Sequence, residues 1–281
     1  MILGFLGKGG SGKSSVATQM ALHAHSKGRT VLAVDADHNM DISYNLLKEG
    51  SIDTTQYLGA ALQEVLDHVG AEKGETYGDI FLHGCDTRFT VEPPDTFTDM
   101  YSITVKERLR LMVAGPQTDT VLYGKSCSHV LTTPLKVYLP LLEPKVDDVV
   151  VVDEKAGADG VTTGIVTGLD VGVIVCEPAL HSLKTARQIA ELMEFYGTPS
   201  LFVGNKISTS EDKDFITEHL GVEPVTYLME STAVRREPSE QVAEWQDEMA
   251  TILKHASTLN KNDRLERTRA KFERNKNYRG S

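Results

Sequence analysis

The sequence GKGGSGKSS at residues 7–15 follows the apolar run ILGFL (2–6) and precedes a segment whose apolar residues recur at helical spacing. Gly28 comes directly after that segment, at the position where glycine commonly ends a helix. The next run, TVLAV at 30–34, is almost entirely apolar, which is typical of a parallel strand buried on both faces. Strand, glycine loop, helix and strand within about 35 residues predict one βαβ unit.

The glycine-rich loop has the composition that a phosphate-binding loop requires. Its four glycines allow backbone N–H groups to point inward, and the helix that follows adds positive potential at its N-terminus. Lys13 is predicted to pair with β- and γ-phosphate oxygens, and the Ser14 hydroxyl to bind Mg²⁺. The alternative is a glycine-rich turn without a ligand. The predicted nucleotide-binding residues of the loop are consecutive: Gly7, Lys8, Gly9, Gly10, Ser11, Gly12, Lys13, Ser14 and Ser15.

Strands and helices continue to alternate in the second half of the chain. Runs of apolar residues at 149–152, 171–175 and 201–203 predict further buried strands. Helical patterns cover 180–195 and 240–259. The expected fold is therefore α/β, with a mostly parallel twisted sheet and helices on both faces.

Residues 50–125 fit this alternation poorly. A helix is predicted at 58–69, and residues 70–100 are polar and rich in Gly, Thr, Asp and Pro. We interpret the region as a surface insertion. The alternative is a mobile segment that becomes ordered when nucleotide or a partner binds.

The composition changes near the C-terminus. We expect one domain at 1–260 and a basic tail at 261–281, where eight Lys and Arg residues face three Asp and Glu. The tail is predicted to be a solvated helix or a frayed end. An arm that binds nucleic acid or a partner is the alternative.

Composition limits the classes of function. The 281-residue chain is 40% hydrophobic, and its net charge of −11 argues against DNA binding by the whole surface while leaving a local basic patch open. Its three cysteines are scattered, which predicts a reducing, cytoplasmic compartment. The N-terminal run breaks too early for a signal peptide, and we expect no membrane-spanning segment.

Lys8 distinguishes this loop from a plain Walker A motif. The pattern GKGGxGKS resembles that of the deviant Walker A P-loop ATPases, a family that includes the nitrogenase iron protein, partition ATPases, septum-site-determining ATPases and arsenite-pump ATPases. The resemblance implies an ATP-binding and ATP-hydrolysing homodimer in which two subunits enclose two ATP molecules. Lys8 would reach the phosphates of the second subunit and neutralise transition-state charge. The alternative is a solvated loop lysine.

The same resemblance assigns roles to residues after other strands. Asp37 and Asp41 match the spacing at which the nitrogenase iron protein places a water-orienting carboxylate and a carboxylate near Mg²⁺. Asp153 is similar to the Walker B carboxylate that holds Mg²⁺ through water, and 154–157 correspond to a segment that senses the γ-phosphate. The catalytic residues are thus expected to be Lys8, Lys13 and Asp37.

The segment GNKIS at 204–208 is similar to the base-binding segment of this family. The resemblance implies that the Asn205 amide binds adenine, with Lys206 beside it. Guanine-specific relatives carry aspartate where this chain has Ser208, which favours ATP over GTP.

Three segments resemble one branch of the family, the carbon monoxide dehydrogenase accessory ATPases. They are CEPALHSLKTA at 176–186, VGNK at 203–206, and DADHN at 35–39, where that branch has DADPN. This implies a role in inserting nickel into a client metalloenzyme. The rival hypotheses are a partition or positioning ATPase that acts on DNA or a partner protein, and a slow-turnover module that uses ATP to dock a partner.

The chain departs from this branch at the metal site. It has Cys127-Ser128-His129 in place of a Cys-x-Cys pair, and residues 154–168 contain no cysteine. A two-fold dimer could bring two Cys127 and two His129 side chains together as ligands for Zn²⁺ or Ni²⁺. A buried cysteine with an unrelated histidine is the alternative.

Overall fold

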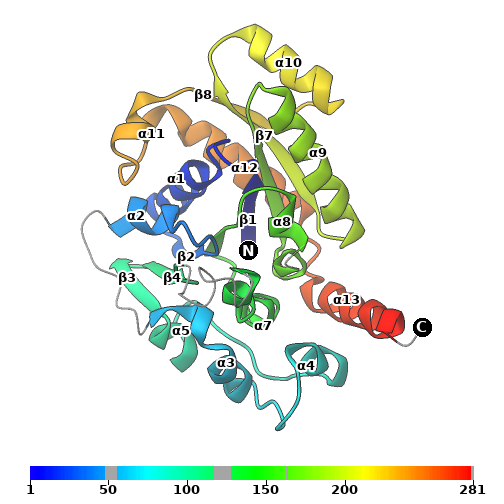
Figure 1. The fold of residues 1–281 in the computed structure, drawn as a ribbon. Helices are drawn as coiled ribbons and strands as arrows, with labels where there is room; N and C mark the ends of the chain where they lie inside the picture. Colours follow the sequence, from blue (N-terminus) through cyan, green and yellow to red (C-terminus); the bar gives the residue numbers. More distant parts are fainter. Residues whose placement is uncertain (48–55, 117–127, 163, 280–281) are drawn as a thin grey trace.

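The computed structural model describes residues 1–47, 56–116, 128–162 and 164–279. In this part of the chain, eight strands form one sheet in the order β3-β4-β2-β5-β1-β6-β7-β8 (Figure 1). The strands are β1 (Ile2–Gly7), β2 (Thr30–Asp35), β3 (Ser102–Lys106), β4 (Leu109–Val113), β5 (Asp148–Asp153), β6 (Val171–Cys176), β7 (Ser200–Ile207) and β8 (Thr226–Met229). The predicted α/β fold with a mostly parallel sheet is confirmed.

The pairing of the strands brings several loops to one edge of the sheet. Every neighbouring pair is parallel except β3 and β4, which are antiparallel. β1 lies between β5 and β6, and β5 separates it from β2. Asp35 and Asp153, the last residues of β2 and β5, lie opposite each other in the register. Polar residues from separate parts of the chain therefore meet beside the loop after β1.

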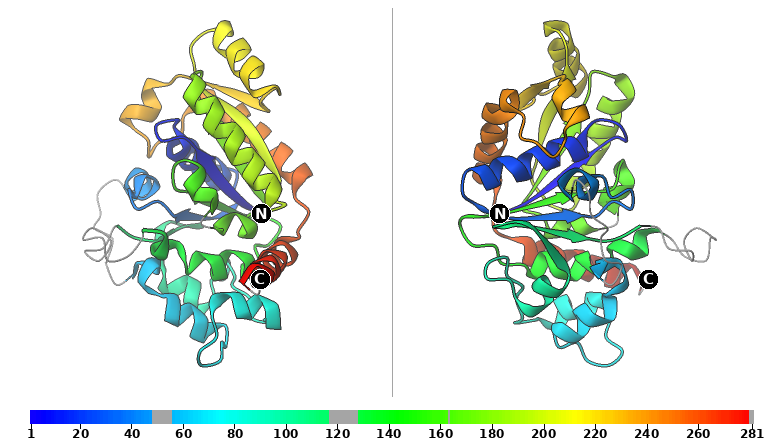
Figure 2. Two further views of the ribbon diagram at one scale, coloured as in Figure 1. Left: turned by 45° about the vertical axis from the view of Figure 1, so that its right-hand side comes forward. Right: turned by 90° about the vertical axis from the view of Figure 1, so that its left-hand side faces the viewer.

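Helices cover both faces of the sheet, as Figures 1 and 2 show. Alternate residues of the central strands face two separate cores; in β5, for example, Val149 faces one core and Val150 the other. One core packs against α1 (Lys13–Ser26), α2 (Asp41–Leu47), α11 (Thr232–Arg236) and α12 (Gln246–Leu259). The other packs against α3 (Leu62–His68), α4 (Tyr77–His83), α5 (Thr96–Met100), α7 (Leu135–Leu141), α8 (Ala158–Thr162), α9 (Leu180–Phe195), α10 (Ser210–Leu220) and α13 (Arg264–Arg279).

The interpretation of residues 50–125 as a surface insertion is wrong for 102–113. These residues form β3 and β4, and β4 pairs with β2 to extend the sheet. Arg108 turns the chain between the two strands with a φ of 61°. The strands were missed because charged residues interrupt them, which is common where a hairpin forms the edge of a sheet.

Two predicted helices have different bounds in the structure. The helix expected at 58–69 is divided at Ala61, which has φ −95° and ψ 30°, into the short 3₁₀ helix Leu58–Ala60 and α3. The helix expected at 240–259 begins at Gln246 instead. Val242 is extended there, and its N–H donates to the side chain of Gln19 rather than to a helical carbonyl.

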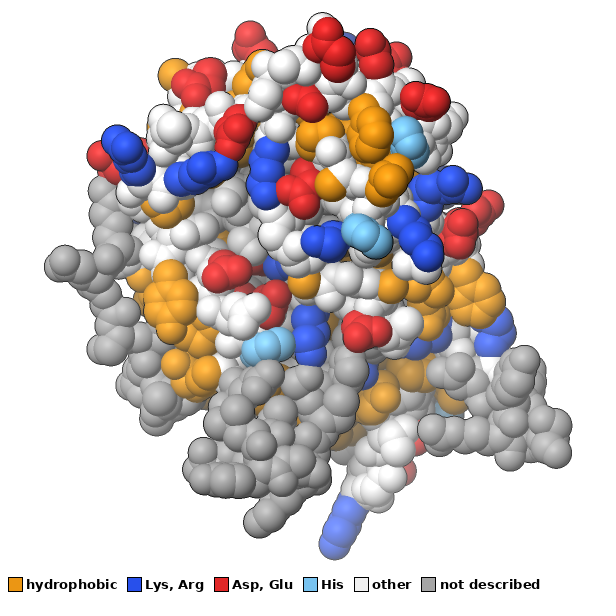
Figure 3. Space-filling model, turned by 45° about the horizontal axis from the view of Figure 1, so that its top comes forward, with side chains coloured by type: hydrophobic (Ala, Val, Ile, Leu, Met, Phe, Trp, Pro, Cys, Tyr) orange, Lys and Arg blue, Asp and Glu red, His pale blue; other side chains and the backbone are white. Residues whose placement is uncertain are grey.

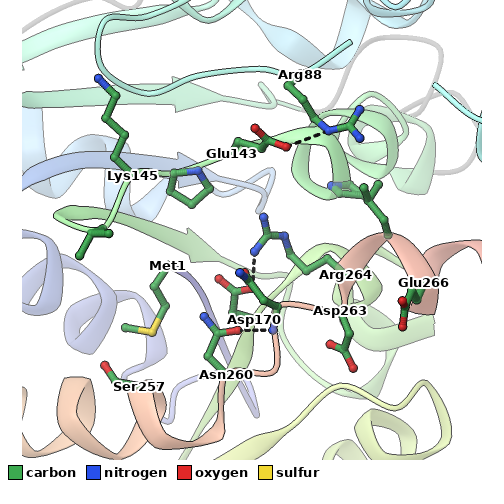
Figure 4. Close-up of a pocket in the computed structure, with 15 residues that line it drawn as sticks. Met1, Arg88, Glu143, Lys145, Asp170, Ser257, Asn260, Asp263, Arg264 and Glu266 are labelled. Atoms are coloured by element: carbon green, nitrogen blue, oxygen red, sulfur yellow. Dashed lines mark hydrogen bonds and ion pairs between the residues drawn. The ribbon is translucent and has the colours of Figure 1, made fainter. Parts of the chain in front are cut away.

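The basic segment at the C-terminus forms α13, and the first half of this helix is packed rather than solvated. Arg264, Arg267 and Thr268 are buried, and the Arg267 guanidinium donates to the Leu169 carbonyl. Figure 4 shows Arg264 facing Asp170, with which it forms an ion pair. The other carboxylate oxygen of Asp170 accepts from the N–H of Ile2 at 2.7 Å. Asp170 therefore connects α13 to the central strand of the sheet.

Among the helices in the described part of the chain, none combines the length and the apolar composition needed to cross a bilayer.

Candidate nucleotide site

The site lies where the carboxyl ends of the parallel strands meet, which is where open α/β sheets bind ligands. The glycine loop follows β1, Asp37 follows β2, Asp153 ends β5, and Lys206 lies near the end of β7. The loop, Asp37 and Lys206 line a cavity of about 450 Å³, and the fully buried Asp153 contacts Lys13 of its lining. Its lining comes from five parts of the chain: Gly9, Gly10, Gly12, Lys13, Ser14, Ser15, Asp37, Asn39, Asp41, Asn45, Ala156, Lys206, Val234, Arg235 and Pro238.

Glycine is required at specific points of the loop. Gly10 and Gly12 have φ angles of 86° and 90°, a region that residues with a side chain rarely adopt. A Cβ on Gly12 would lie 2.3 Å from Nδ2 of Asn205, and a Cβ on Gly7 would lie 2.5 Å from the carbonyl oxygen of Val175. The loop is therefore compact, with its backbone held against β6 and β7.

Lys13 lies at the floor of the cavity between two carboxylates. Its Nζ is 2.9 Å from Oδ1 of Asp153 and 3.3 Å from Oδ2 of Asp37, and it also lies 3.2 Å from the Ser14 hydroxyl. Burial lowers the pKa of the ammonium group, but the attraction of Asp153 and Asp37 outweighs it and the net shift is upward. Lys13 is thus a fixed positive charge beside the phosphate-binding loop.

Further carboxylates are buried around this lysine. Burial raises the pKa of Asp35 to about 8, with a further contribution from the negative charge of Asp153. Burial likewise raises the pKa of Glu154 to about 8, and its Oε1 has no hydrogen-bond partner. Burial also raises the pKa of Asp153, although Lys13 opposes the shift. Carboxyls with raised pKa values retain their protons at neutral pH, and a cation bound beside them would favour their ionised form.

The residues predicted to hold Mg²⁺ fit that ion. Oδ2 of Asp153 is buried and lacks a hydrogen-bond partner, and the nearby Ser14 hydroxyl lowers the pKa of the same carboxylate. Asp41 lies at the rim of the same cavity, exposed at the first residue of α2. Carboxylate and hydroxyl oxygens are the ligands that Mg²⁺ binds. Ser14 and Asp153 therefore have the chemistry of Mg²⁺ ligands, beside the loop that is predicted to bind the phosphates.

Asn205 and Lys206 hold the glycine loop against β7. The Asn205 amide is buried and donates to the Ser11 carbonyl at 2.8 Å. Lys206 donates to the Gly10 carbonyl at 2.5 Å and pairs with Glu177 at 2.6 Å.

Lys8 lies on the exposed side of the glycine loop. Its Nζ is 3.3 Å from the Gly9 carbonyl.

The transition-metal hypothesis lies mostly outside the described residues. Cys127 is not among them, and nothing is described of the His129 side chain. Elsewhere, in the residues that the structure does describe, no group of three or more His, Cys, Asp or Glu side chains is arranged to hold a metal ion.

Several residues of the site were not identified from the sequence. Asn45, Val234, Arg235 and Pro238 line the cavity, and Glu177 pairs with Lys206. Glu177 follows a predicted strand, as Asp153 does, and that position was an available signal. The others come from helices and loops that no phosphate-binding pattern includes.

Charge is unevenly distributed on the surface that carries the site. In Figure 3, acidic side chains gather at the end of the molecule that carries α10, and Lys and Arg side chains form a band below them. The sequence of α10, SEDKDFITEHL, accounts for this acidic end. The net charge of −11 is therefore not spread evenly, and positive charge remains locally available.

The comparisons with known proteins agree with this geometry. Residues 5–268 match the family described as CbiA, the CobQ/CobB/MinD/ParA nucleotide binding domain. The chain belongs to this family. The predicted membership of the deviant Walker A P-loop ATPases is thereby confirmed.

Curated relatives align with most of the chain. An uncharacterized ATP-binding protein of Methanocaldococcus jannaschii is 29% identical over 232 residues, which are 80% of this chain and 86% of the relative. The carbon monoxide dehydrogenase accessory protein CooC of Rhodospirillum rubrum is 24% identical over 220 residues, 78% of this chain and 79% of that protein.

Solved structures share the fold at lower identity. The cell division ATPase MinD of Pyrococcus furiosus aligns with a TM-score of 0.58 at 18% identity, covering 92% of this chain and 98% of that one. The septum site-determining protein MinD of Pyrococcus horikoshii OT3, complexed with Mg-ADP, aligns with a TM-score of 0.59 at 18% identity and the same coverage. These likenesses concern the fold.

Proposed function

We propose that this protein is an ATP-driven switch that binds Mg-ATP at the glycine loop, dimerises around it and hydrolyses it. The observation that carries the proposal is the position of Lys13. Its Nζ contacts Asp37 and Asp153, which brings the residues predicted to bind phosphate, orient water and hold the metal next to one another beside the cavity. Phosphoryl transfer depends mainly on such positioning and on charge neutralisation.

Each group has a defined part in the proposed reaction. The backbone of the loop and Lys13 bind the phosphates, while Ser14 and Asp153 hold Mg²⁺, which neutralises phosphate charge when it is bound. Asp37 orients the attacking water, and its carboxylate is held 3.3 Å from Lys13. Lys8, at the exposed side of the loop, supplies a second cation to the nucleotide of the other subunit.

We further propose that the switch acts on a client metalloenzyme, as an accessory ATPase for the insertion of a metal such as nickel. The similarity to CooC, together with the segments at 35–39 and 176–186, supports this assignment. Binding of Zn²⁺ or Ni²⁺ by Cys127 and His129 at a dimer interface stays a prediction. Metal analysis of the ATP-bound protein and of Cys127→Ser decides it.

The central experiment uses Asp37→Asn. The amide keeps the shape of the side chain but orients the attacking water less well, so we expect slow hydrolysis and an accumulated ATP-bound dimer. Size-exclusion chromatography with light scattering, with and without Mg-ATP, measures the dimer, and phosphate release measures turnover. A monomeric profile with ATP together with normal turnover in Asp37→Asn would contradict the proposal. Stimulation of turnover by DNA alone would favour a partition-type role over a metal-related one.

A further inference from the structure

Helix α1 does more than present its N-terminus to the loop. Most of its buried side chains are apolar, but Gln19 lies among them and is fully buried. A buried primary amide is unfavourable unless its donors and acceptor are paired. In this protein they are paired with a segment more than 200 residues away in the sequence.

Gln19 holds the loop between α11 and α12 through three hydrogen bonds. Its Nε2 donates to the carbonyl of Glu240 at 2.8 Å and to that of Pro238 at 3.3 Å. Its Oε1 accepts from the N–H of Val242 at 2.9 Å. Residues 237–242 lie between α11 and the 3₁₀ helix Ala243–Trp245, so this side chain supplies bonds that a regular element would supply internally.

A second contact, one helical turn further along α1, strengthens the attachment. His23 is buried and lies 2.7 Å from Oε1 of Gln246, while Nε2 of Gln246 donates to the Val242 carbonyl at 2.8 Å. Residues four apart lie on the same face of a helix, so Gln19 and His23 act together on the loop.

This loop is one wall of the nucleotide cavity. Pro238 lines the cavity together with Val234 and Arg235 of α11. A second lining residue is also attached to α1, because the Asn45 amide donates to the Thr18 hydroxyl at 3.0 Å. Two consecutive residues of α1, Thr18 and Gln19, are thus each bonded to a residue that lines the cavity.

The residues that line the cavity differ in chemistry. The glycine loop and Lys13 supply N–H groups and positive charge for phosphates, whereas Pro238 and the small exposed part of Val234 add apolar atoms beside Arg235. Apolar surface beside a phosphate site suits the flat face of a nucleoside base. We propose that Gln19 is a positioning residue for the base of the nucleotide, acting through Pro238 and the wall that it fixes. This inference rests on the proposed function, because it concerns the same site.

The test compares two ligands that share phosphates but not a base. Gln19→Met keeps the length of the side chain and removes the three hydrogen bonds. We expect the affinity for ATP to fall about tenfold, because the segment that carries Pro238 loses the hydrogen bonds that fix its position. The affinity for inorganic tripolyphosphate should change by less than about twofold, because the phosphate loop is untouched. Isothermal titration calorimetry with Mg²⁺ measures both affinities.

Two further variants make the result decisive. Thr198→Val removes a buried hydrogen bond to the Val166 carbonyl near the start of β7, and it should leave both affinities unchanged even if it lowers stability. Gln19→Glu keeps the acceptor for Val242 and removes the donors to Pro238 and Glu240. Its affinity for ATP should fall while its affinity for tripolyphosphate stays the same. This variant provides the test if Gln19→Met does not fold.

The assignment of Gln19 would be overturned if a Gln19 variant lost as much affinity for tripolyphosphate as for ATP. It would also be overturned if the variant bound ATP with normal affinity. A separate measurement tests the proposed function itself. If that function is wrong, Lys13→Ala should bind ATP as tightly as the unaltered protein does.

Discussion

Glu154 is the residue whose environment is least expected from its chemistry. It directly follows the predicted magnesium ligand Asp153, yet its side chain is buried and one carboxylate oxygen has no hydrogen-bond partner. Burial raises its pKa from 4.5 to about 8. Between these two values the folded protein retains a proton that the unfolded chain releases. The free energy of unfolding must therefore fall as pH rises through this window.

We predict that Glu154→Gln removes this pH dependence. The amide cannot ionise, so the variant should gain stability relative to the unaltered protein as pH rises from about 5 to 8, by up to about 1.4 kcal/mol per pH unit. Urea unfolding at several pH values, in EDTA and without nucleotide, measures the difference. Asp35 is present in both proteins, so its similar titration cancels. A stability difference that is constant with pH would contradict the pKa shift.

At the scale of elements, α13 is held by charged and polar contacts in addition to its apolar contacts with the core. Arg264, Arg267, Thr268 and Lys271 recur at helical spacing and contact residues 164–170, which lie between α8 and β6. Burial lowers the pKa of Lys271 to about 8, with Lys136 adding to the shift. The helix is thus attached to the chain just beyond the segment at 154–157 that is predicted to sense the γ-phosphate.

We predict a strong coupling between Arg264 and Asp170. Arg264→Met should lower the free energy of unfolding by about 3–5 kcal/mol, because it leaves a buried carboxylate without its cation. In the double variant with Asp170→Asn the loss should be smaller than the sum of the two single losses. Denaturant unfolding of the three variants measures this coupling. Strictly additive losses would show that the ion pair does not hold α13.

The elements near the loop were predictable because their patterns are local. The buried strands at 149–152 and 171–175 are runs of consecutive apolar residues, and the helix predicted at 180–195 has the bounds of α9. The contact between Lys13 and Asp153 could be expected, since both follow central strands of one sheet.

The missed parts depend on distant partners. In the 3₁₀ helix before Ala61, the N–H of Gly59 donates to the distant Ala114 carbonyl, and β4 is a strand because β2 lies beside it. The late start of α12 depends on Gln19, which lies more than 200 residues earlier in the chain. No window of sequence contains both partners of such a contact.

At the scale of the whole molecule, the proposed dimer makes Lys8 act on the other subunit. Lys8→Ala should bind ATP but hydrolyse it slowly, and Lys13→Ala should not bind ATP. An equimolar mixture should recover turnover, since the mixed dimer pairs an intact loop on one subunit with an intact Lys8 on the other. Recovery cannot exceed about half of normal turnover, because each mixed dimer has one complete site. A mixture no more active than its components would refute a role for Lys8 across the interface.

The central place of β1 in the sheet also has a consequence for the synthesis of the protein. β1 is synthesised before both of its partners in the sheet, β5 and β6, which begin at Asp148 and Val171. At ~5–20 residues per second, β5 follows after roughly 7–30 s. During that interval an apolar strand has both edges unpaired and is open to chaperones or to other nascent chains. Ribosome-bound chains halted before residue 148 should therefore be protease-sensitive, and chains that extend well beyond residue 176 should be the first to gain resistance.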